Sequence, residues 1–251
     1  MELSSRIKNF WEADAESYSE GIRKELSGQV KDAWVKIILE NAPPQKELDI
    51  LDVGTGPGFF PIILTQEGHR VTGIDLTENM IAQAKRNLED LGLSAELLTM
   101  DCQDLQFNDN RFDLIICRNL TWTLDNPEKA YAEWRRVLRP GGRILVFDAC
   151  WNLHLVSEDA AGEYKQKVAE IDKKYGPYQG TGHHDPNELE AISKKLFMTN
   201  KIRPQWDLET LLRLGFSKVF ADVTVGERYT QDEWQRAVQA LHPPFMVGGE
   251  K

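Results

Sequence analysis

The sequence has few cysteines and no long apolar run. Its 251 residues include three cysteines, an odd number without the spacing of a metal site, so a reducing compartment is favoured over a disulfide framework. No stretch approaches the roughly 18 uninterrupted apolar residues of a membrane-spanning helix. The first twenty residues lack the apolar segment of a signal peptide. We therefore expect a cytoplasmic protein without a membrane partner.

Positive charge is also scarce. The chain has 30 Lys and Arg against 40 Asp and Glu, a formal net charge of -10. Because nucleic-acid binding depends on Lys and Arg that neutralise phosphates, this balance argues against a nucleic-acid partner. Hydrophobic residues make up 41% of the chain, which is ordinary for a globular protein with a full core. The composition favours a small-molecule partner and leaves the oligomeric state open.

Apolar stretches alternate with helical patterns between about residues 48 and 148. This alternation predicts an α/β fold with a parallel sheet, in which helices cover both faces. Asn126, followed by Pro127, is expected to cap one helix, and Thr77 to cap another. The strand candidates are LDILDVG, HRVTGID, AELLTMD, FDLIICR and RILVFDA.

Three glycines follow the first strand, in the stretch LDVGTGPGFF. Gly54, Gly56 and Gly58 lie where this strand turns into a helix, at the carboxyl edge of the expected sheet. A ligand bound there meets bare backbone amides and a helix N-terminus. A tight turn without a ligand needs one glycine, and each further glycine raises the entropic cost of folding. The stretch therefore predicts a ligand site.

The spacing of the glycines bears on which ligand binds. The dinucleotide fingerprint G-x-G-x-x-G requires its third glycine at position 59, which is Phe59 here. The observed spacing is G-x-G-x-G, with Asp52 two residues before the first glycine. The second strand ends in Asp75, where a carboxylate can accept hydrogen bonds from a ribose, and the third is followed by Asp101.

In their order, these motifs resemble the class I S-adenosylmethionine-dependent methyltransferases, specifically the small-molecule type called methyltransferase type 11. The resemblance covers roughly residues 10–150 and, less closely, 205–225. It implies a doubly wound, mostly parallel seven-stranded Rossmann-like sheet with a helical lid insertion. It also implies a transferase that moves a methyl group from S-adenosyl-L-methionine to a small-molecule acceptor, leaving S-adenosyl-L-homocysteine. The alternatives are a non-catalytic S-adenosylmethionine-binding sensor or partner protein, and a nucleotide-dependent oxidoreductase.

The resemblance implies roles for particular residues. The glycine loop is expected to pass under the methionine part of the cofactor, Asp75 to hold the ribose and Asp101 to accept from the adenine amine. Each residue also has a structural interpretation, such as a helix cap for Asp75 and a solvated loop charge for Asp101. The expected cofactor-binding residues are Tyr18, Asp52, Gly54, Thr55, Gly56, Gly58, Asp75, Leu76, Met80, Asp101, Cys102, Arg118 and Asn119.

A long stretch beyond the fifth strand is the expected acceptor region. Residues 157–175 have one apolar stripe and predict an amphipathic helix, and residues 185–197 predict a second helix that Asp185 and Glu188 cap. The loop GPYQGTGHHDP joins them. Its turn GTGHHD is expected to close over the methyl group, or else to be solvent-facing. The candidate acceptor contacts are Tyr18, Trp122, His183 and His184.

These patterns suggest four segments: 1–47 as an N-terminal helical lid, 48–149 as the cofactor-binding core, 150–205 as a lid insertion and 206–251 as the rest of the core. No catalytic residue is predicted, because in-line methyl transfer depends largely on positioning and needs a general base only for a protonated acceptor. No metal is expected. In a strand order 3-2-1-4-5, the cysteine after the third strand lies about 14 Å or more from the other two.

Overall fold

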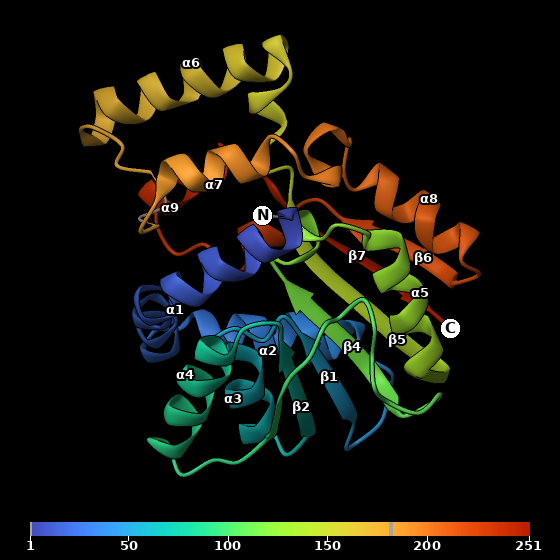
Figure 1. The fold of residues 1–251 in the computed structure, drawn as a ribbon. Helices are drawn as coiled ribbons and strands as arrows, with labels where there is room; N and C mark the ends of the chain where they lie inside the picture. Colours follow the sequence, from blue (N-terminus) through green and yellow to red (C-terminus); the bar gives the residue numbers. More distant parts are fainter. Residues whose placement is uncertain (1, 181–182) are drawn as a thin grey trace.

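A seven-stranded sheet forms the centre of the molecule in the computed structural model, which describes residues 2–180 and 183–251 (Figure 1). Its order is β3-β2-β1-β4-β5-β7-β6. The first five strands run parallel, and β7 is antiparallel to β5 and β6. The expected doubly wound, mostly parallel sheet is confirmed. The strands are β1 (Asp49–Val53), β2 (Arg70–Asp75), β3 (Glu96–Thr99), β4 (Phe112–Arg118), β5 (Leu138–Ala149), β6 (Ser217–Asp222) and β7 (Pro244–Glu250).

Helices cover both faces of the sheet, because successive side chains of a strand point to opposite faces. Ile50 faces a cluster with α2, α3 and α4, whereas its neighbour Leu51 faces a cluster with α5 and α8. Trp134 of α5 is fully buried in the second of these clusters. The helices are α1 (Leu3–Ser27), α2 (Val30–Asn41), α3 (Phe59–Gln66), α4 (Glu78–Glu89), α5 (Pro127–Val137), α6 (Glu158–Tyr175), α7 (Pro186–Ser193), α8 (Gln205–Arg213) and α9 (Glu233–Gln239).

A third apolar cluster lies over the carboxyl edge of the sheet. Phe10 of α1 and Ile192 of α7 pack there with Trp122, which follows β4. An ion pair reinforces this contact, since the Arg6 guanidinium donates to both carboxylate oxygens of Glu188 at 2.8 Å. Figure 1 shows α1 and α7 together above the strand ends, with α6 beyond them. Helix α1 and helix α7 of the insertion therefore form one shared cover over the strand ends, which we call the roof.

Side-chain caps explain where two helices begin. The Asn126 side chain accepts from the backbone N–H of Lys129, and that of Asp185 from the backbone N–H of Glu188, as expected. Thr77 occupies the N-cap position of α4, as expected, but its side chain makes no capping hydrogen bond. Its hydroxyl donates instead to Asp75 Oδ1 at 2.8 Å, because that carboxylate lies two residues away.

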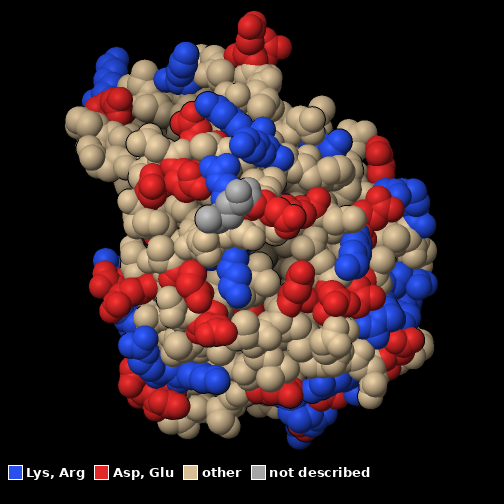
Figure 2. Space-filling view, in the orientation of Figure 1, with Lys and Arg blue, Asp and Glu red and all other residues tan. Residues whose placement is uncertain are grey.

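The insertion contains both expected helices, α6 and α7. The side chains of the α6 stripe, including Ile171 and Tyr164, are buried or half-buried, while most of the other residues of α6 are exposed. Residues 181–182, part of the turn GTGHHD, lie outside the described residues, and the division of the chain into four segments stays a prediction. On the face shown in Figure 2, acidic and basic side chains are interspersed.

The cysteine thiols are buried or half-buried and unpaired. Burial raises the pKa of Cys102, Cys117 and Cys150, so all three stay protonated at neutral pH. Across residues 2–180 and 183–251, the structure has no group of three or more His, Cys, Asp or Glu side chains placed to hold a metal ion. No helix in these ranges has both the length and the apolarity to cross a membrane.

Candidate functional site

The glycine loop adopts left-handed backbone conformations. Gly54, Gly56 and Gly58 have φ angles of +67°, +50° and +88°, which strain any other residue. A Cβ on Gly54 would lie 2.8 Å from a methyl carbon of Leu120, and one on Gly58 would lie 3.1 Å from the Cβ of Ala84. A Cβ on Gly56 would meet only Tyr18 Cε1, at 3.7 Å. Protein neighbours therefore fill the space at two glycines, and Gly56 faces a cavity.

Asp52 stabilises the conformation of the glycine loop without lining the cavity. Its Oδ2 accepts from the Thr55 hydroxyl at 2.6 Å, and the Thr55 backbone N–H donates to the Ile74 carbonyl at 2.8 Å. Burial raises the pKa of Asp52 to about 7, against the lowering effects of the Thr55 hydrogen bond and the Arg118 charge. Asp52, Thr55 and Gly58 are buried and do not line the cavity, so their proposed role is to shape the loop.

Asp75 both holds the loop and faces the cavity. Its Oδ2 accepts from the backbone N–H of Gly56 at 3.0 Å, and its Oδ1 accepts from the backbone N–H and the hydroxyl of Thr77 at 3.0 and 2.8 Å. Burial raises its pKa. A carboxylate has about four acceptor positions, so it can accept one more hydrogen bond from a ligand. The binding and structural interpretations of Asp75 are therefore compatible.

The cofactor cavity, as we call it, has a volume of about 280 Å³. Leu76, 37% exposed, and the buried Met80 supply apolar walls beside the Asp75 carboxylate. These apolar walls and the adjacent carboxylate fit the flat adenine base, the ribose hydroxyls and the extended methionine part of S-adenosylmethionine. Of the expected residues, those that line the cavity are Tyr18, Gly54, Gly56, Asp75, Leu76, Met80, Asp101, Cys102, Arg118 and Asn119; their roles stay predictions.

One wall of the cofactor cavity was missed by the sequence reasoning. It comes from α1, which contributes Ser4, Lys8 and Trp11. These residues have no motif, and only the packing of α1 across the strand ends brings them to the cavity. Gln103, which follows the expected Asp101, also lines it, and its backbone N–H donates to Asp101 Oδ1 at 2.8 Å.

Two residues after β4 have different surroundings. Arg118 donates to Glu25 Oε2 at 2.9 Å, and its guanidinium lies 4.4 Å from the Phe59 ring centroid. Its charge is therefore already paired within the protein. Asn119 has a left-handed φ of +55°, and its carbonyl accepts from Trp122 Nε1 at 2.9 Å. A strained non-glycine residue is typical of functional sites.

A second cavity, with a volume of about 680 Å³, adjoins the first. We call it the acceptor cavity. Trp11, Tyr18 and Asn119 line both cavities, so these three residues mark the junction. Aromatic and imidazole rings dominate its remaining wall, which includes Trp122, Trp151, His154, Tyr164, Tyr178, His183 and His242.

The expected histidines converge on one carboxylate, Asp14 of α1. His183 Nδ1 lies 2.8 Å from Asp14 Oδ2, and His184 Nδ1 lies 3.1 Å from Asp14 Oδ1. Although burial raises its pKa, the hydrogen bonds from both histidines hold the pKa of Asp14 below its usual value. His183 lines the acceptor cavity, whereas His184 stacks at 4.8 Å on Phe10 outside that lining. Any role of His183 or His184 in acceptor binding stays a prediction.

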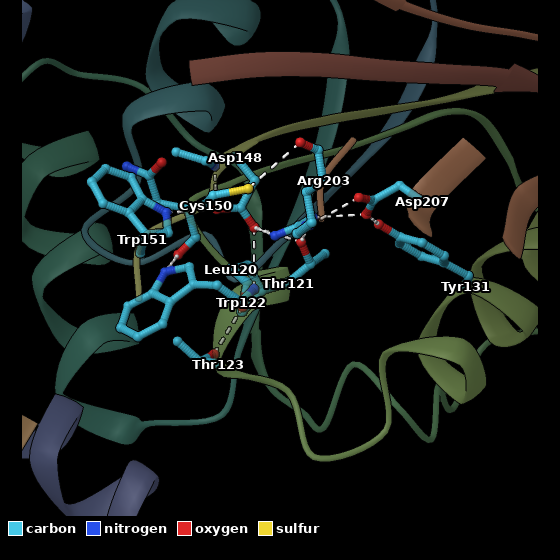
Figure 3. Close-up of polar contacts among 12 residues, drawn as sticks. Leu120, Thr121, Trp122, Thr123, Tyr131, Asp148, Cys150, Trp151, Arg203 and Asp207 are labelled. Carbon is cyan, nitrogen blue, oxygen red and sulfur yellow. Dashed lines mark hydrogen bonds and ion pairs between the residues drawn. The ribbon is translucent and has the colours of Figure 1, made fainter. Parts of the chain in front are cut away.

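A buried network of ion pairs and hydrogen bonds contacts residues of the acceptor-cavity wall (Figure 3). Arg203, 1% exposed at its side chain, donates to Asp148 Oδ2 at 2.9 Å and to the two Asp207 oxygens at 2.7 and 2.8 Å. Tyr131 donates to Asp207 at 2.6 Å, and Thr121 to Asp148 at 2.5 Å. The network joins β5, α5 and α8 to the end of the insertion.

Asp148 also accepts hydrogen bonds from two aromatic residues of the acceptor-cavity wall. Its Oδ1 accepts from Trp151 Nε1 at 2.7 Å, and its Oδ2 accepts from the Trp122 backbone N–H at 3.1 Å. Figure 3 shows both indoles on the same side of Asp148, away from Asp207. The Arg203 network therefore positions the Trp122 and Trp151 walls of the acceptor cavity. The sequence contained no signal for it, because its three parts, residues 121–131, Asp148 and residues 203–207, are far apart in the chain.

The chain was compared with known proteins. A family model described as "Methyltransferase domain" matches residues 51–146, which hold the glycine loop, Asp75 and Asp101. This match covers the part of the chain in which the sequence motifs resemble the class I S-adenosylmethionine-dependent methyltransferases. A solved S-adenosylmethionine-dependent methyltransferase from Methanococcus maripaludis has a TM-score of 0.58 at 18% identity, covering 94% of this chain and 91% of that one. This likeness shows that the methyltransferase fold extends over nearly the whole chain.

Two curated relatives of this methyltransferase domain differ in what they act on. Phosphatidylethanolamine N-methyltransferase of Cereibacter sphaeroides is 30% identical over 149 residues, which are 57% of this chain and 66% of that relative. Demethylmenaquinone methyltransferase of Bacteroides fragilis is 27% identical over 230 residues, 89% of each chain. The chain spans less than two thirds of the first relative, and 30% of a phosphoethanolamine N-methyltransferase from Triticum aestivum.

Proposed function

We propose that this chain is an S-adenosylmethionine-dependent methyltransferase that acts on a small-molecule acceptor. The observation that carries this proposal is the junction of two cavities. The cofactor cavity lies at the glycine loop, and the acceptor cavity meets it at Trp11, Tyr18 and Asn119. A protein that only bound the cofactor would have no need for a second, larger cavity at that point.

The cofactor supplies a methyl group on a positively charged sulfur, which an acceptor displaces in line. The chain's own residues would hold it: Asp75 would accept from the ribose hydroxyls, and Leu76 and Met80 would pack on the base. The Gly56 backbone and the Tyr18 ring would hold the methionine part. Because such a displacement depends mainly on the alignment of donor and acceptor, this positioning supplies much of the rate.

Exclusion of water is the second contribution of the protein. Helix α1 lines both cavities and α7 lines the acceptor cavity, and the Arg6–Glu188 pair joins the two helices. Closure over the reacting atoms strengthens electrostatic interactions there and prevents hydrolysis. We infer that the N-terminal lid and the insertion act together as this cover.

A methyl-transfer assay tests the proposal. The protein is incubated with S-adenosylmethionine labelled in its methyl group and with panels of phenols, amines, thiols and carboxylates, and label in the products is counted. Labelled product from at least one acceptor class is expected. Tight S-adenosylmethionine binding with no transfer to any class would instead support the sensor alternative.

A further inference from the structure

The acceptor cavity has no free cation on its wall. Among the described residues that line it, none is Lys or Arg. The nearest helix N-terminus, at α7, is not open to an anion either. Its first residue, Pro186, has no N–H, and the Asp185 carboxylate already accepts from Glu188. A phosphate or carboxylate in this cavity would therefore lose its hydration without a compensating charge.

The carboxylates of the wall are already paired. Each of the three already accepts from a donor within the protein, so a buried ammonium would have to compete with that donor. A free positive charge in the acceptor is therefore less well matched than an uncharged group. The pairs are Asp14 with His183, Glu25 with Arg118, and Glu190 with Lys194.

The remaining wall favours a planar ring. The rings of Tyr164 and His154 stack at 4.2 Å with an interplanar angle of 11°. The Trp151 indole donates to Asp148 Oδ1, and the Trp122 indole donates to the Asn119 carbonyl. Rigid aromatic faces bind flat aromatic ligands by stacking and by excluding water. The wall thus suits an uncharged aromatic molecule.

One group on this wall is placed to take a proton. An ionised carboxylate only accepts hydrogen bonds, so the His183 Nδ1 that faces Asp14 carries the hydrogen. The lone pair is then on Nε2, which has no hydrogen bond to any other described residue. The His183 ring lies 5.4 Å from the ring of Trp11, one of the three junction residues. His183 is therefore both oriented and close to the junction.

The geometry points to an uncharged hydroxylated aromatic acceptor, without phosphate, carboxylate or ammonium, whose hydroxyl proton passes to His183. This inference rests on the proposed function and names its acceptor class. The acceptor O–H bond breaks as its proton moves to Nε2, and the acceptor oxygen, or a ring carbon conjugated with it, bonds to the methyl carbon. The carbon–sulfur bond breaks with its electron pair on sulfur. Proton loss to water restores neutral His183.

Acceptor class is tested with one ring and four substituents. Binding of 1-naphthol, 1-naphthyl phosphate, 1-naphthoate and 1-naphthylmethylamine is measured by calorimetry on protein saturated with S-adenosylhomocysteine. We expect 1-naphthol to bind at least about tenfold more tightly than each charged analogue. Equal or tighter binding of any charged analogue, or no binding of 1-naphthol, would overturn the acceptor class. Failure of the first step, saturation with S-adenosylhomocysteine, would instead count against the proposed function.

The role of His183 is tested with His183→Asn, whose amide can still donate to Asp14 but has no Nε2 lone pair. Transfer to 1-naphthol should fall by about 10² to 10⁴ in kcat, the usual contribution of a general base. The binding of S-adenosylhomocysteine and of 1-naphthol should change less than threefold. His184→Asn, on the same carboxylate but outside the cavity lining, should lose much less activity. Equal losses in both variants, or full activity of His183→Asn, would refute the proton transfer.

Discussion

The two cavities that meet at Tyr18 are built in different ways. The cofactor cavity takes most of its chemistry from short motifs at the ends of neighbouring parallel strands, such as the glycine loop after β1 and Asp75 at the end of β2. The acceptor cavity joins distant segments: Asp14 and His183 lie 169 positions apart. The comparison indicates that cofactor binding belongs to the sheet edge, whereas acceptor choice belongs to the way α1 and the insertion pack.

The two cavities also differ in the charged groups that they offer a ligand. The cofactor cavity contains an acceptor-capable carboxylate, Asp75, whereas the charged groups around the acceptor cavity are paired with one another. Substitutions should therefore separate the two halves: changes at the sheet edge reduce cofactor affinity, and changes in the paired groups reduce stability or acceptor binding.

The largest effect on stability is expected in the buried Arg203 network beside the acceptor cavity. Arg203→Ala leaves Asp148 and Asp207 buried without their cation, which should lower the free energy of unfolding by about 3 to 5 kcal/mol. Denaturant unfolding measures it. The matched control is Arg213→Ala, because Arg213 also pairs with a carboxylate, Glu128, but in solvent. A surface pair contributes about 1 kcal/mol or less. Similar losses in the two variants would contradict the supporting role of Arg203.

The glycine loop gives the next comparison. Gly58→Ala places a Cβ 3.1 Å from that of Ala84 at a φ of +88°, so it should lower the free energy of unfolding by more than the roughly 1 to 2 kcal/mol of left-handed strain alone. Gly56→Ala carries the strain without this contact, and should instead weaken S-adenosylhomocysteine binding at least about tenfold. Thermal unfolding and calorimetry on both variants would show whether stability and binding separate in this way.

Asp75→Ala should lower both the affinity for the cofactor and the stability of the ligand-free protein. Its loss removes a hydrogen-bond acceptor for the ribose, which we expect to weaken cofactor binding by about 1.5 to 3 kcal/mol. Asp75 also accepts hydrogen bonds from Gly56 and Thr77, so the ligand-free variant should melt at a lower temperature as well. Asp104→Ala, an exposed acid outside the cavity, is the control; weaker cofactor binding there would indicate a general charge effect.

The sequence predicted the sheet edge because its signals are local. Left-handed glycines, a strand-end carboxylate and helix caps such as Asn126 depend on neighbouring residues, so their pattern is visible in the chain. Asp14 had no such signal: it lies in a helix, and its hydrogen bonds come from the other end of the chain. Lys8 and Trp11 were missed for the same reason.

Strand β7 was missed for a different reason. Its sequence PFMVGGE contains two glycines, which usually weaken a strand. In the sheet they are required by packing, because a Cβ on Gly248 would lie 2.3 Å from the ring of Phe220 in β6, and one on Gly249 would lie 3.2 Å from Phe216. A neighbour that lies far away in the sequence therefore decides why glycine occurs there.

The smallest expected effect is a pH dependence at Asp52. Its folded pKa of about 7 exceeds the ordinary value of 3.8, so the folded protein binds this proton more tightly and loses stability as pH rises from about 4 to about 7. Asp52→Asn carries no charge and keeps an oxygen for Thr55, whereas Arg118 and Asp75 are unchanged. The parent loses about 1 kcal/mol between pH 6 and pH 7, so the melting temperature of the variant relative to the parent should rise by about 2 to 4 °C over that interval. A constant difference would show that Asp52 does not titrate in this range.

The most direct test of the central claim is a calorimetric titration of the unmodified protein with S-adenosylhomocysteine and, separately, with NAD. The G-x-G-x-G spacing, Phe59 in place of a third dinucleotide glycine, and the cavity beside Asp75 all favour the first ligand. We predict saturable heat at one site for S-adenosylhomocysteine, and neither heat nor competition from NAD. Tight NAD binding together with no heat from S-adenosylhomocysteine would contradict the assignment of the cofactor cavity and, with it, the proposed function.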